Sequence, residues 1–186
     1  MAFIRTFICI ELPLSIKEYL AALQRRLEPL GRGVRWVKPE NIHLTLNFLG
    51  DVEKASIDKV VQAVARAAQE IPPFSVRLSA AGAFPNLNRP RVYWVGVQDG
   101  SGVLLKLQKK IENELDPDIF AIERRKYSPH LTIGRVKFKD GLEKISDELR
   151  VEKCPPLDIV ANEVTIMKSE LSPQGAVYTP LAAVKL

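Results

Sequence analysis

The hydrophobic and polar positions along this chain switch repeatedly between strand-like and helix-like spacing. Residues 2–11 are rich in apolar and β-branched side chains, which predicts a strand. Apolar residues then recur at three- and four-residue steps from 14 to 30, as on one face of a helix. The same patterns predict further helices at 51–70, 101–115 and 142–149, and further strands at 34–37, 43–49, 74–81, 91–97, 130–136, 158–171 and 176–185.

These predicted elements recur when the sequence is shifted by 87 residues. The first helix then falls on the segment 101–115, and Val76 falls on Glu163 within the strands that close the two halves. The order strand, helix, strand, helix, strand is common to both halves. We therefore predict an α+β fold, in which residues 1–186 form a single domain of two pseudo-symmetric lobes. Each lobe has an antiparallel sheet with helices outside, and a central cleft lies between the lobes.

The only two histidines of the chain take equivalent places in this repeat, in the tetrapeptides His43-Leu44-Thr45-Leu46 and His130-Leu131-Thr132-Ile133. In a strand, residues i and i+2 share one face. The imidazole and the hydroxyl of each tetrapeptide are therefore expected to point together into the cleft, while the aliphatic residues enter the core. One such tetrapeptide is typical of an ordinary sheet, but two copies at equivalent places indicate a paired site.

Composition limits the kind of protein without identifying it. The chain has 186 residues, of which 46% are hydrophobic and 26% charged, a balance that predicts a folded globular protein. Its net charge of +5 suits an anionic partner such as RNA or a nucleotide. Two cysteines without metal-type spacing favour a reducing compartment. With no apolar stretch long enough to cross a bilayer, we expect a soluble cytoplasmic protein that binds no membrane.

One imidazole and one hydroxyl from each lobe suit the cleavage or formation of a phosphodiester. The unperturbed pKa of histidine, about 6.5, lets one imidazole accept a proton while the other donates one. Threonine hydroxyls can donate hydrogen bonds to phosphoryl oxygens that gain charge. The sequence contains no phosphate-binding glycine loop, no dinucleotide fingerprint and no zinc-type ligand spacing. We therefore expect neither a cofactor nor a metal ion.

The two tetrapeptides match the paired His-x-Thr-x motifs of the two-histidine phosphoesterase superfamily. The segments that follow them, Phe48-Leu49-Gly50 and Gly134-Arg135-Val136, resemble those of the RNA 2′,3′-cyclic phosphodiesterases, formerly called 2′-5′ RNA ligases. The segments 82–85 and 90–94 resemble the same branch. The similarity covers essentially the whole chain, and the duplicated bilobal fold of the family agrees with the fold predicted above.

The resemblance implies hydrolysis of RNA 2′,3′-cyclic phosphate ends to 2′-phosphomonoesters. It assigns His43 as proton donor to the departing 3′-oxygen and His130 as proton acceptor from water, an orientation that the near-symmetric motifs do not themselves decide. By microscopic reversibility, the same pair is expected to catalyse a weaker 2′-5′ ligation of a cyclic phosphate end to a 5′-hydroxyl end. The implied partners are RNA ends of these kinds, tRNA fragments among them, and we expect a monomer.

Two other functions stay open at this point. One is a cyclic phosphodiesterase that acts on a small nucleotide instead of RNA. The other is a non-catalytic module that binds RNA ends, although such a module would not need an ionisable imidazole in both lobes. The basic residues that flank the motifs favour longer RNA.

Several further residues are candidates for binding. Thr45, Thr132 and Arg135 are predicted to hold the phosphate, although strict alternation places Arg135 on the core face with Leu131 and Ile133 unless the strand twists or ends there. The basic run before the second motif predicts RNA contacts, or else a solvated loop, at Arg124, Arg125, Lys126 and Tyr127. Three aromatic side chains are candidates for stacking on bases, Trp36, Phe84 and Tyr127, with packing within a lobe as the alternative for Trp36 and Phe84.

Overall fold

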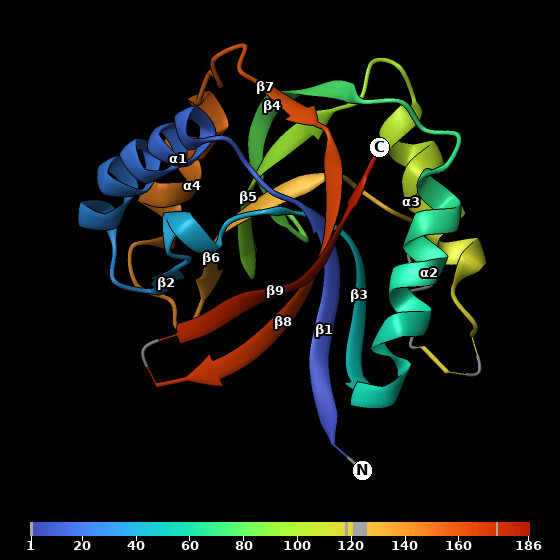
Figure 1. The fold of residues 1–186 in the computed structure, drawn as a ribbon. Helices are drawn as coiled ribbons and strands as arrows, with labels where there is room; N and C mark the ends of the chain where they lie inside the picture. Colours follow the sequence, from blue (N-terminus) through green and yellow to red (C-terminus); the bar gives the residue numbers. More distant parts are fainter. Residues whose placement is uncertain (1, 118, 121–125, 174) are drawn as a thin grey trace.

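The computed structural model describes residues 2–117, 119–120, 126–173 and 175–186, and its elements form two antiparallel sheets with helices outside them (Figure 1). The four-stranded sheet has the order β3-β1-β8-β9, and the five-stranded sheet has the order β2-β6-β5-β4-β7. The α-helices are α1 (Leu14–Leu27), α2 (Ile57–Ala68), α3 (Val103–Glu114) and α4 (Leu142–Val151). The strands are β1 (Phe3–Ile10), β2 (Val34–Trp36), β3 (Leu44–Glu53), β4 (Phe74–Phe84), β5 (Val92–Gln98), β6 (His130–Val136), β7 (Asp158–Ala161), β8 (Glu163–Ser172) and β9 (Gly175–Lys185).

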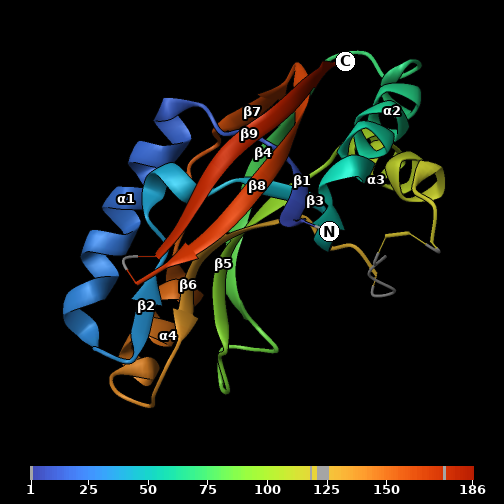
Figure 2. The ribbon, with the colours of Figure 1, turned by 60° about the horizontal axis from the view of Figure 1, so that its bottom comes forward.

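The helices lie in two pairs on opposite flanks of the molecule. In both ribbon views α1 and α4 lie beside the five-stranded sheet, while α2 and α3 pack together on the other flank, near the four-stranded sheet (Figures 1 and 2). The predicted α+β fold of two antiparallel-sheet lobes is therefore confirmed. No helix of the described segments is both long and apolar enough to cross a membrane.

The repeat is interlaced rather than divided at the middle of the chain. The strand that closes the first half, β4, pairs with β5 of the second half. The strand that closes the second half, β8, pairs with β1. Each sheet thus takes strands from both halves of the chain, and neither half completes a sheet alone. We therefore propose that residues 1–186 form one domain of two lobes.

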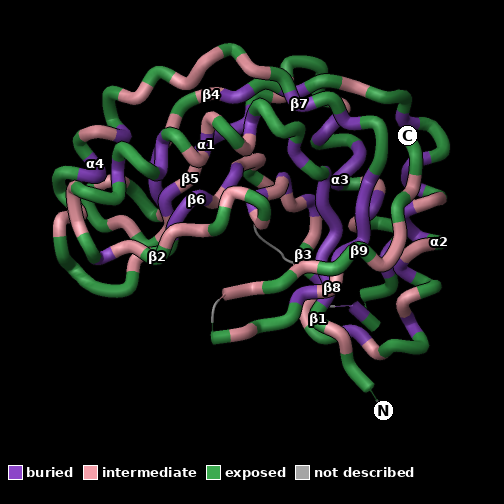
Figure 3. Tube along the Cα trace, turned by 60° about the vertical axis from the view of Figure 1, so that its left-hand side comes forward, coloured by how far each residue is buried: buried purple, intermediate pink, exposed green. Residues whose placement is uncertain are grey.

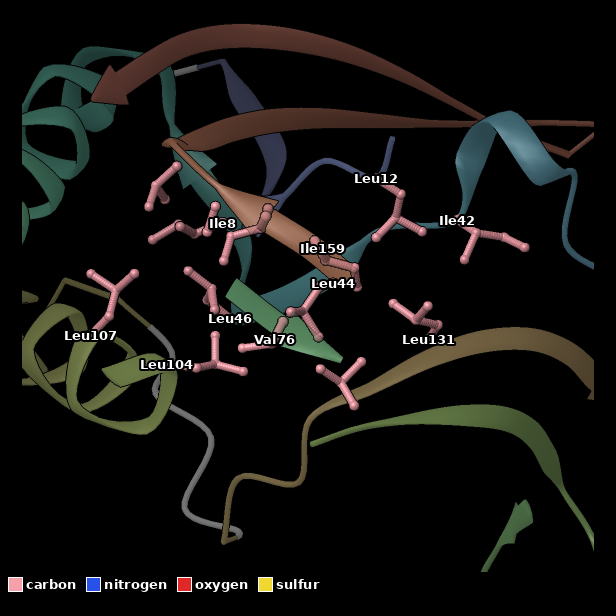
Figure 4. Packing of buried hydrophobic residues seen from close by; sticks show 14 of the residues in the cluster. Ile8, Leu12, Ile42, Leu44, Leu46, Val76, Leu104, Leu107, Leu131 and Ile159 are labelled. Atoms are coloured by element: carbon pink, nitrogen blue, oxygen red, sulfur yellow. The ribbon is translucent and has the colours of Figure 1, made fainter. Parts of the chain in front are cut away.

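One continuous hydrophobic cluster joins the two lobes behind the motif strands. Leu44, Leu46 and Leu131 are almost fully buried within it, as the alternation around the histidines predicts (Figure 4). Each such side chain contributes about 1.5–3 kcal/mol when it is fully buried. Buried positions follow the inner strands and helix faces, and exposed positions follow the outside (Figure 3). The motif strands are therefore anchored on one face, which leaves the other face to the site.

Two predicted boundaries were wrong. The segment 158–171 is not one strand, because β7 pairs with β4 in one sheet and β8 pairs with β1 in the other. The change of sheet falls at Asn162 and Glu163, two exposed polar residues between the apolar segments 159–161 and 164–167, and the prediction ran one strand through them. Residues 51–53 belong to β3 and not to the following helix, since Val52 is buried and pairs with Ile4.

Candidate active site

A cleft of about 530 Å³ lies where the two motif strands approach each other, and it is lined by residues of both sheets. His43, the residue before β3, and Thr45, within β3, reach the cleft from one sheet. His130 and Thr132 reach it from β6 in the other sheet. The structure therefore brings together all four motif residues that the sequence singles out. Arg135 lines the same cleft.

A β-bulge at the same place in each motif strand explains why Arg135 faces the cleft. In β6, the paired residues are Tyr93 with Gly134 and Trp94 with Thr132, so Ile133 is the extra residue. The insertion of one residue exchanges the faces that the following residues occupy. In β3, a bulge at Leu46, the equivalent position, turns Phe48 toward the cleft in the same way.

Both motif histidines are held in the same tautomer by backbone carbonyl groups. The distance from Nδ1 of His43 to the carbonyl oxygen of Asn41 is 2.9 Å, and that from Nδ1 of His130 to the carbonyl oxygen of Ser128 is 2.7 Å. A carbonyl oxygen only accepts, so each Nδ1 carries a hydrogen. Proton transfer to or from a substrate therefore falls to the Nε2 atom of each ring.

His43 is enclosed by aromatic side chains from β1 and β9. Its ring stacks on Phe7 at a centroid distance of 4.5 Å, and Tyr178 meets it edge-on at 5.3 Å. Burial lowers the pKa of His43 to about 4, and the positive charges of Lys17 and Arg135 act in the same direction, whereas the Asn41 carbonyl opposes them. In the free protein His43 is therefore neutral at pH 7.

The surroundings of His130 are more open. Its bond to the Ser128 carbonyl is exposed, whereas the corresponding bond of His43 is partly buried. Phe84 meets the His130 ring edge-on at 4.9 Å and also packs against Trp94. Phe84 thus has a packing role beside the site. Trp36 likewise stacks on a neighbouring aromatic ring, that of Tyr93, although it also lines the cleft.

The structure describes only Lys126 and Tyr127 of the basic run before the second motif. Arg124 and Arg125 lie outside the described residues, and Lys126 is exposed but is not among the residues that line the cleft. The hydroxyl of Tyr127 donates a hydrogen bond to the carbonyl oxygen of Thr45 at 2.9 Å. Tyr127 packs against the core and connects the two motifs, a placement that favours a positioning role over base stacking.

The buried side chain of Gln24 holds the second motif in place by hydrogen bonds from helix α1. Nε2 of Gln24, in α1, donates to the carbonyl oxygens of Val37 at 2.6 Å and of Ile133, the bulge residue, at 2.8 Å. Sequence reasoning missed Gln24. Its signal was a polar residue on the apolar face of the first helix, next to Leu23 and one turn before Leu27.

The described lining of the cleft has two contrasting sides. An aromatic wall from the four-stranded sheet consists of Phe7, Phe48 and Tyr178. A cationic wall, from β2, β6 and the residues that follow them, consists of Arg35, Lys38, Arg135 and Lys137. Of the cationic wall, sequence reasoning identified Arg135 alone, because the pairing of β2 with β6 could not be deduced from the pattern.

The described residues were compared with two other kinds of site, a metal-binding cluster and a reactive thiol. They contain no group of three or more histidine, cysteine, aspartate or glutamate side chains arranged to hold a metal ion. Cys9 is fully buried, and burial raises the pKa of its thiol far above the usual range, which suppresses its reactivity. Cys9 is thus a core residue.

The duplicated fold and the facing His-x-Thr-x motifs define a phosphoesterase of the two-histidine class. The family model described as LigT-like phosphoesterase matches this chain twice, at residues 10–94 and 95–178. The chain therefore belongs to the LigT-like phosphoesterase family, and each half of the repeat corresponds to one copy of the family model.

Relatives and solved structures match this chain over nearly its whole length. Proteins named RNA 2′,3′-cyclic phosphodiesterase from Thermotoga maritima and Methanocaldococcus jannaschii are 35% and 36% identical to this chain. The first match covers 95% of this chain and 92% of its relative, and the second covers 94% and 96%. A crystal structure from Thermus thermophilus has a TM-score of 0.81 at 26% identity, covering 98% of this chain and 97% of that one. Escherichia coli LigT complexed with 3′-AMP has a TM-score of 0.80 at 25% identity, covering 100% and 99%.

Proposed function

We propose that this protein hydrolyses 2′,3′-cyclic phosphate ends of RNA to 2′-phosphomonoesters, without a metal ion. The observation that carries the proposal is the pair of imidazoles in one cleft, each with Nδ1 bonded to a carbonyl and each accompanied by a threonine hydroxyl. The names of the full-length relatives point to the same substrate. RNA ends, tRNA fragments among them, are the proposed partners.

In the proposed reaction a water molecule attacks phosphorus in line with the bond to the 3′-oxygen. Nε2 of His130 accepts a proton from this water as its oxygen bonds to phosphorus. The bond from phosphorus to the 3′-oxygen breaks, and His43 donates a proton to that oxygen. The products are a 3′-hydroxyl and a 2′-phosphate, and each histidine is returned to its starting state by exchange of one proton with solvent.

The donor role of His43 requires that substrate binding restores its proton. Burial holds the pKa of His43 near 4 in the free protein, so the ring is neutral before substrate enters. A cyclic phosphate brings a negative charge beside the imidazole, and a nearby opposite charge favours the protonated form. The Nδ1 hydrogen bond to Asn41 stays in place, because both nitrogens donate in the charged ring. Binding of the phosphate and protonation of His43 are therefore coupled.

The remaining motif residues hold the phosphoryl group. Thr45 and Thr132 offer hydroxyl donors from opposite lobes, and Arg135 offers a guanidinium on the same face of β6. Donors fixed in advance stabilise the charge that develops on the non-bridging oxygens. The reverse reaction, with an RNA 5′-hydroxyl in place of water, needs no other residues, so we propose 2′-5′ ligation as a weaker second activity.

The test uses an oligoribonucleotide that ends in a 2′,3′-cyclic phosphate, incubated with the protein in excess EDTA. Phosphorus NMR then reads the position of the phosphate in the product. We expect a 2′-phosphate, which His43→Ala and His130→Ala form at least about 10²-fold more slowly. A 3′-phosphate would show that the 2′-oxygen, and not the 3′-oxygen, is the leaving group. An unreacted end that still binds would favour a non-catalytic module that binds RNA ends.

A further inference from the structure

The cationic wall exceeds what the reacting phosphate needs. The described lining of the cleft includes five cationic side chains and no aspartate or glutamate: Arg5, Arg35, Lys38, Arg135 and Lys137. None of the ion pairs between described residues involves any of the five. The cyclic phosphate of a single nucleotide carries one negative charge. The surplus of positive charge indicates a substrate with further phosphates.

The position of Arg35 shows where such a phosphate would lie. Arg35 pairs directly with Arg135 across the antiparallel β2–β6 ladder, so the two side chains share one face of the sheet. Like charges placed opposite each other are unfavourable unless an anion joins them. Neighbouring strands are about 4.8 Å apart, which puts Arg35 one strand outward from the motif strand.

Positive charge extends along the β2–β6 ladder on both sides of the Arg35–Arg135 pair. β2 is the edge strand of the five-stranded sheet, so no further strand of the described sheet lies beyond Arg35. Lys38 follows β2 and Lys137 follows β6, so the antiparallel ladder places them at opposite ends; both are exposed and line the cleft. A chain of phosphates that starts at Thr132 can therefore leave the site along β2.

The opposite wall is less suited to a phosphate. Arg5, its one cation, lies over the ring of Phe48 with its guanidinium carbon 4.7 Å from the ring centroid. This cation–π contact engages the guanidinium on an aromatic face. The aromatic wall offers flat apolar surface of the kind on which a nucleobase rests, while the cationic wall offers charge.

We propose that Arg35 binds the phosphodiester immediately 5′ of the cyclic end, with Lys38 and Lys137 adding positive charge on either side of it. Within the proposed RNA substrate, this assigns the preceding phosphodiester to the β2–β6 side of the cleft. This inference rests on the proposed function, because it assumes that the cyclic end lies between the two histidines.

The experiment isolates the linking phosphate. It compares kcat/KM for a dinucleotide ending in a 2′,3′-cyclic phosphate with that for the same dinucleotide whose linking phosphate is replaced by an uncharged methylphosphonate. In the unmodified protein we expect the neutral link to reduce kcat/KM about 10- to 100-fold, the range for a charge-assisted hydrogen bond. In Arg35→Ala this penalty shrinks to less than about threefold, and in Arg35→Lys it is intermediate.

Arg32→Ala is the matched control, since Arg32 is an exposed arginine of the preceding turn that does not line the cleft. It retains the full penalty. The proposal is overturned if Arg35→Ala retains the penalty, or if Arg5→Ala abolishes it instead.

Failure of the proposed function gives a different result. If the unmodified protein hydrolyses neither dinucleotide, the hydrolase assignment fails, while the subsite is still tested by binding. The probes are then 2′-phosphorylated dinucleotides with the charged and the neutral link. The same loss of the penalty in Arg35→Ala, measured as a ratio of Kd values, supports the subsite, and an unchanged ratio overturns it.

Discussion

The two histidine sites are nearly identical in sequence and unlike in surroundings. Phe7 stacks on the His43 ring and Tyr178 meets that ring edge-on, and burial lowers the pKa of the imidazole to about 4. Around His130, Phe84 is the aromatic partner that meets the ring, and the bond to Ser128 is exposed. The repeat thus supplies two matched imidazoles, and the described neighbours enclose His43 more than His130.

The difference traces to residues at equivalent places in the two halves. Phe7 is equivalent to Trp94, but Phe7 stacks on the motif histidine, whereas Trp94 packs on Phe84. After the bulge, Phe48 in one strand corresponds to Arg135 in the other. The paired motifs therefore provide the shared geometry, and these substitutions distinguish an apolar side of the cleft from a charged one.

The largest effect on activity is expected when either imidazole is removed. We expect His43→Ala and His130→Ala each to reduce kcat about 10²- to 10⁴-fold, the usual contribution of a general acid or base. The double variant should lose little more than the weaker single variant, because the two groups act as a unit. Steady-state kinetics on a cyclic-phosphate oligoribonucleotide measures all three, and additive losses would contradict paired roles.

Removing either hydroxyl tests whether the two motifs contribute equally to holding the phosphate. Thr45→Ala and Thr132→Ala should each reduce kcat about 10²- to 10³-fold if the hydroxyl supports the charged phosphoryl group. Thr→Ser at each site is the matched control, since it keeps the hydroxyl and should restore most of the activity. If one threonine proves dispensable, the two motifs divide the work less evenly than their sequences suggest.

The sequence predicted the shared features well. The period-two pattern around each histidine was sufficient to predict both motif strands, and the recurrence of elements at 87 residues predicted the duplicated α+β fold and the shared cleft. Neither was sufficient to predict which strands pair. The exchange of β4 and β8 between the halves arises from long-range pairing, which local hydrophobicity does not encode.

The site residues that were missed depend on the same long-range pairing. Arg35 becomes significant because β2 pairs with β6, and Gln24 because α1 packs behind the bulge at Ile133. Arg135 was predicted, but its side of the strand depended on that bulge, which adds one residue without any glycine or proline at the inserted position. Asymmetry between the histidines is likewise a property of packing, since Tyr178 comes from the last strand.

The acid sensitivity of folding reports the burial of His43 directly. Because the folded pKa, about 4, lies below the unfolded value of about 6.5, the unfolded chain gains a proton first as the pH falls. This residue alone should therefore lower the free energy of unfolding by about 2 kcal/mol between pH 7 and pH 5. Urea unfolding of the intact protein and of His43→Gln at both pH values measures it. An equal pH dependence in the two proteins would contradict a neutral, buried His43.

Proton NMR sharpens the comparison in the substrate-bound state. In the free protein the His43 ring should titrate near pH 4. Saturating 3′-AMP, whose phosphate is the probe, should raise the pKa of His43 by at least one unit, because it places a negative charge beside the ring. A pKa that does not move on binding would argue that His43 stays neutral and acts as the base, with His130 as the acid.

The smallest expected effect tests the tie between the motifs. Tyr127→Phe removes the hydroxyl that donates to the Thr45 carbonyl, and it should cost about 1 kcal/mol of stability, as for one hydrogen bond. If the tie positions the first motif, kcat also falls about 10-fold while KM changes little, because misplacement affects the reacting geometry more than ground-state binding.

Tyr93→Phe provides the matched control for this tie. The Tyr93 hydroxyl also makes hydrogen bonds away from the surface, a buried one with Ser146 and a partly buried one to the Leu142 carbonyl, but these partners lie outside the cleft lining. Its loss should therefore lower stability by a similar amount and leave kcat unchanged. Equal kinetic effects in the two variants would show that Tyr127 acts through general stability, whereas a loss of kcat confined to Tyr127→Phe would show that the first motif depends on a hydroxyl from the second half of the chain.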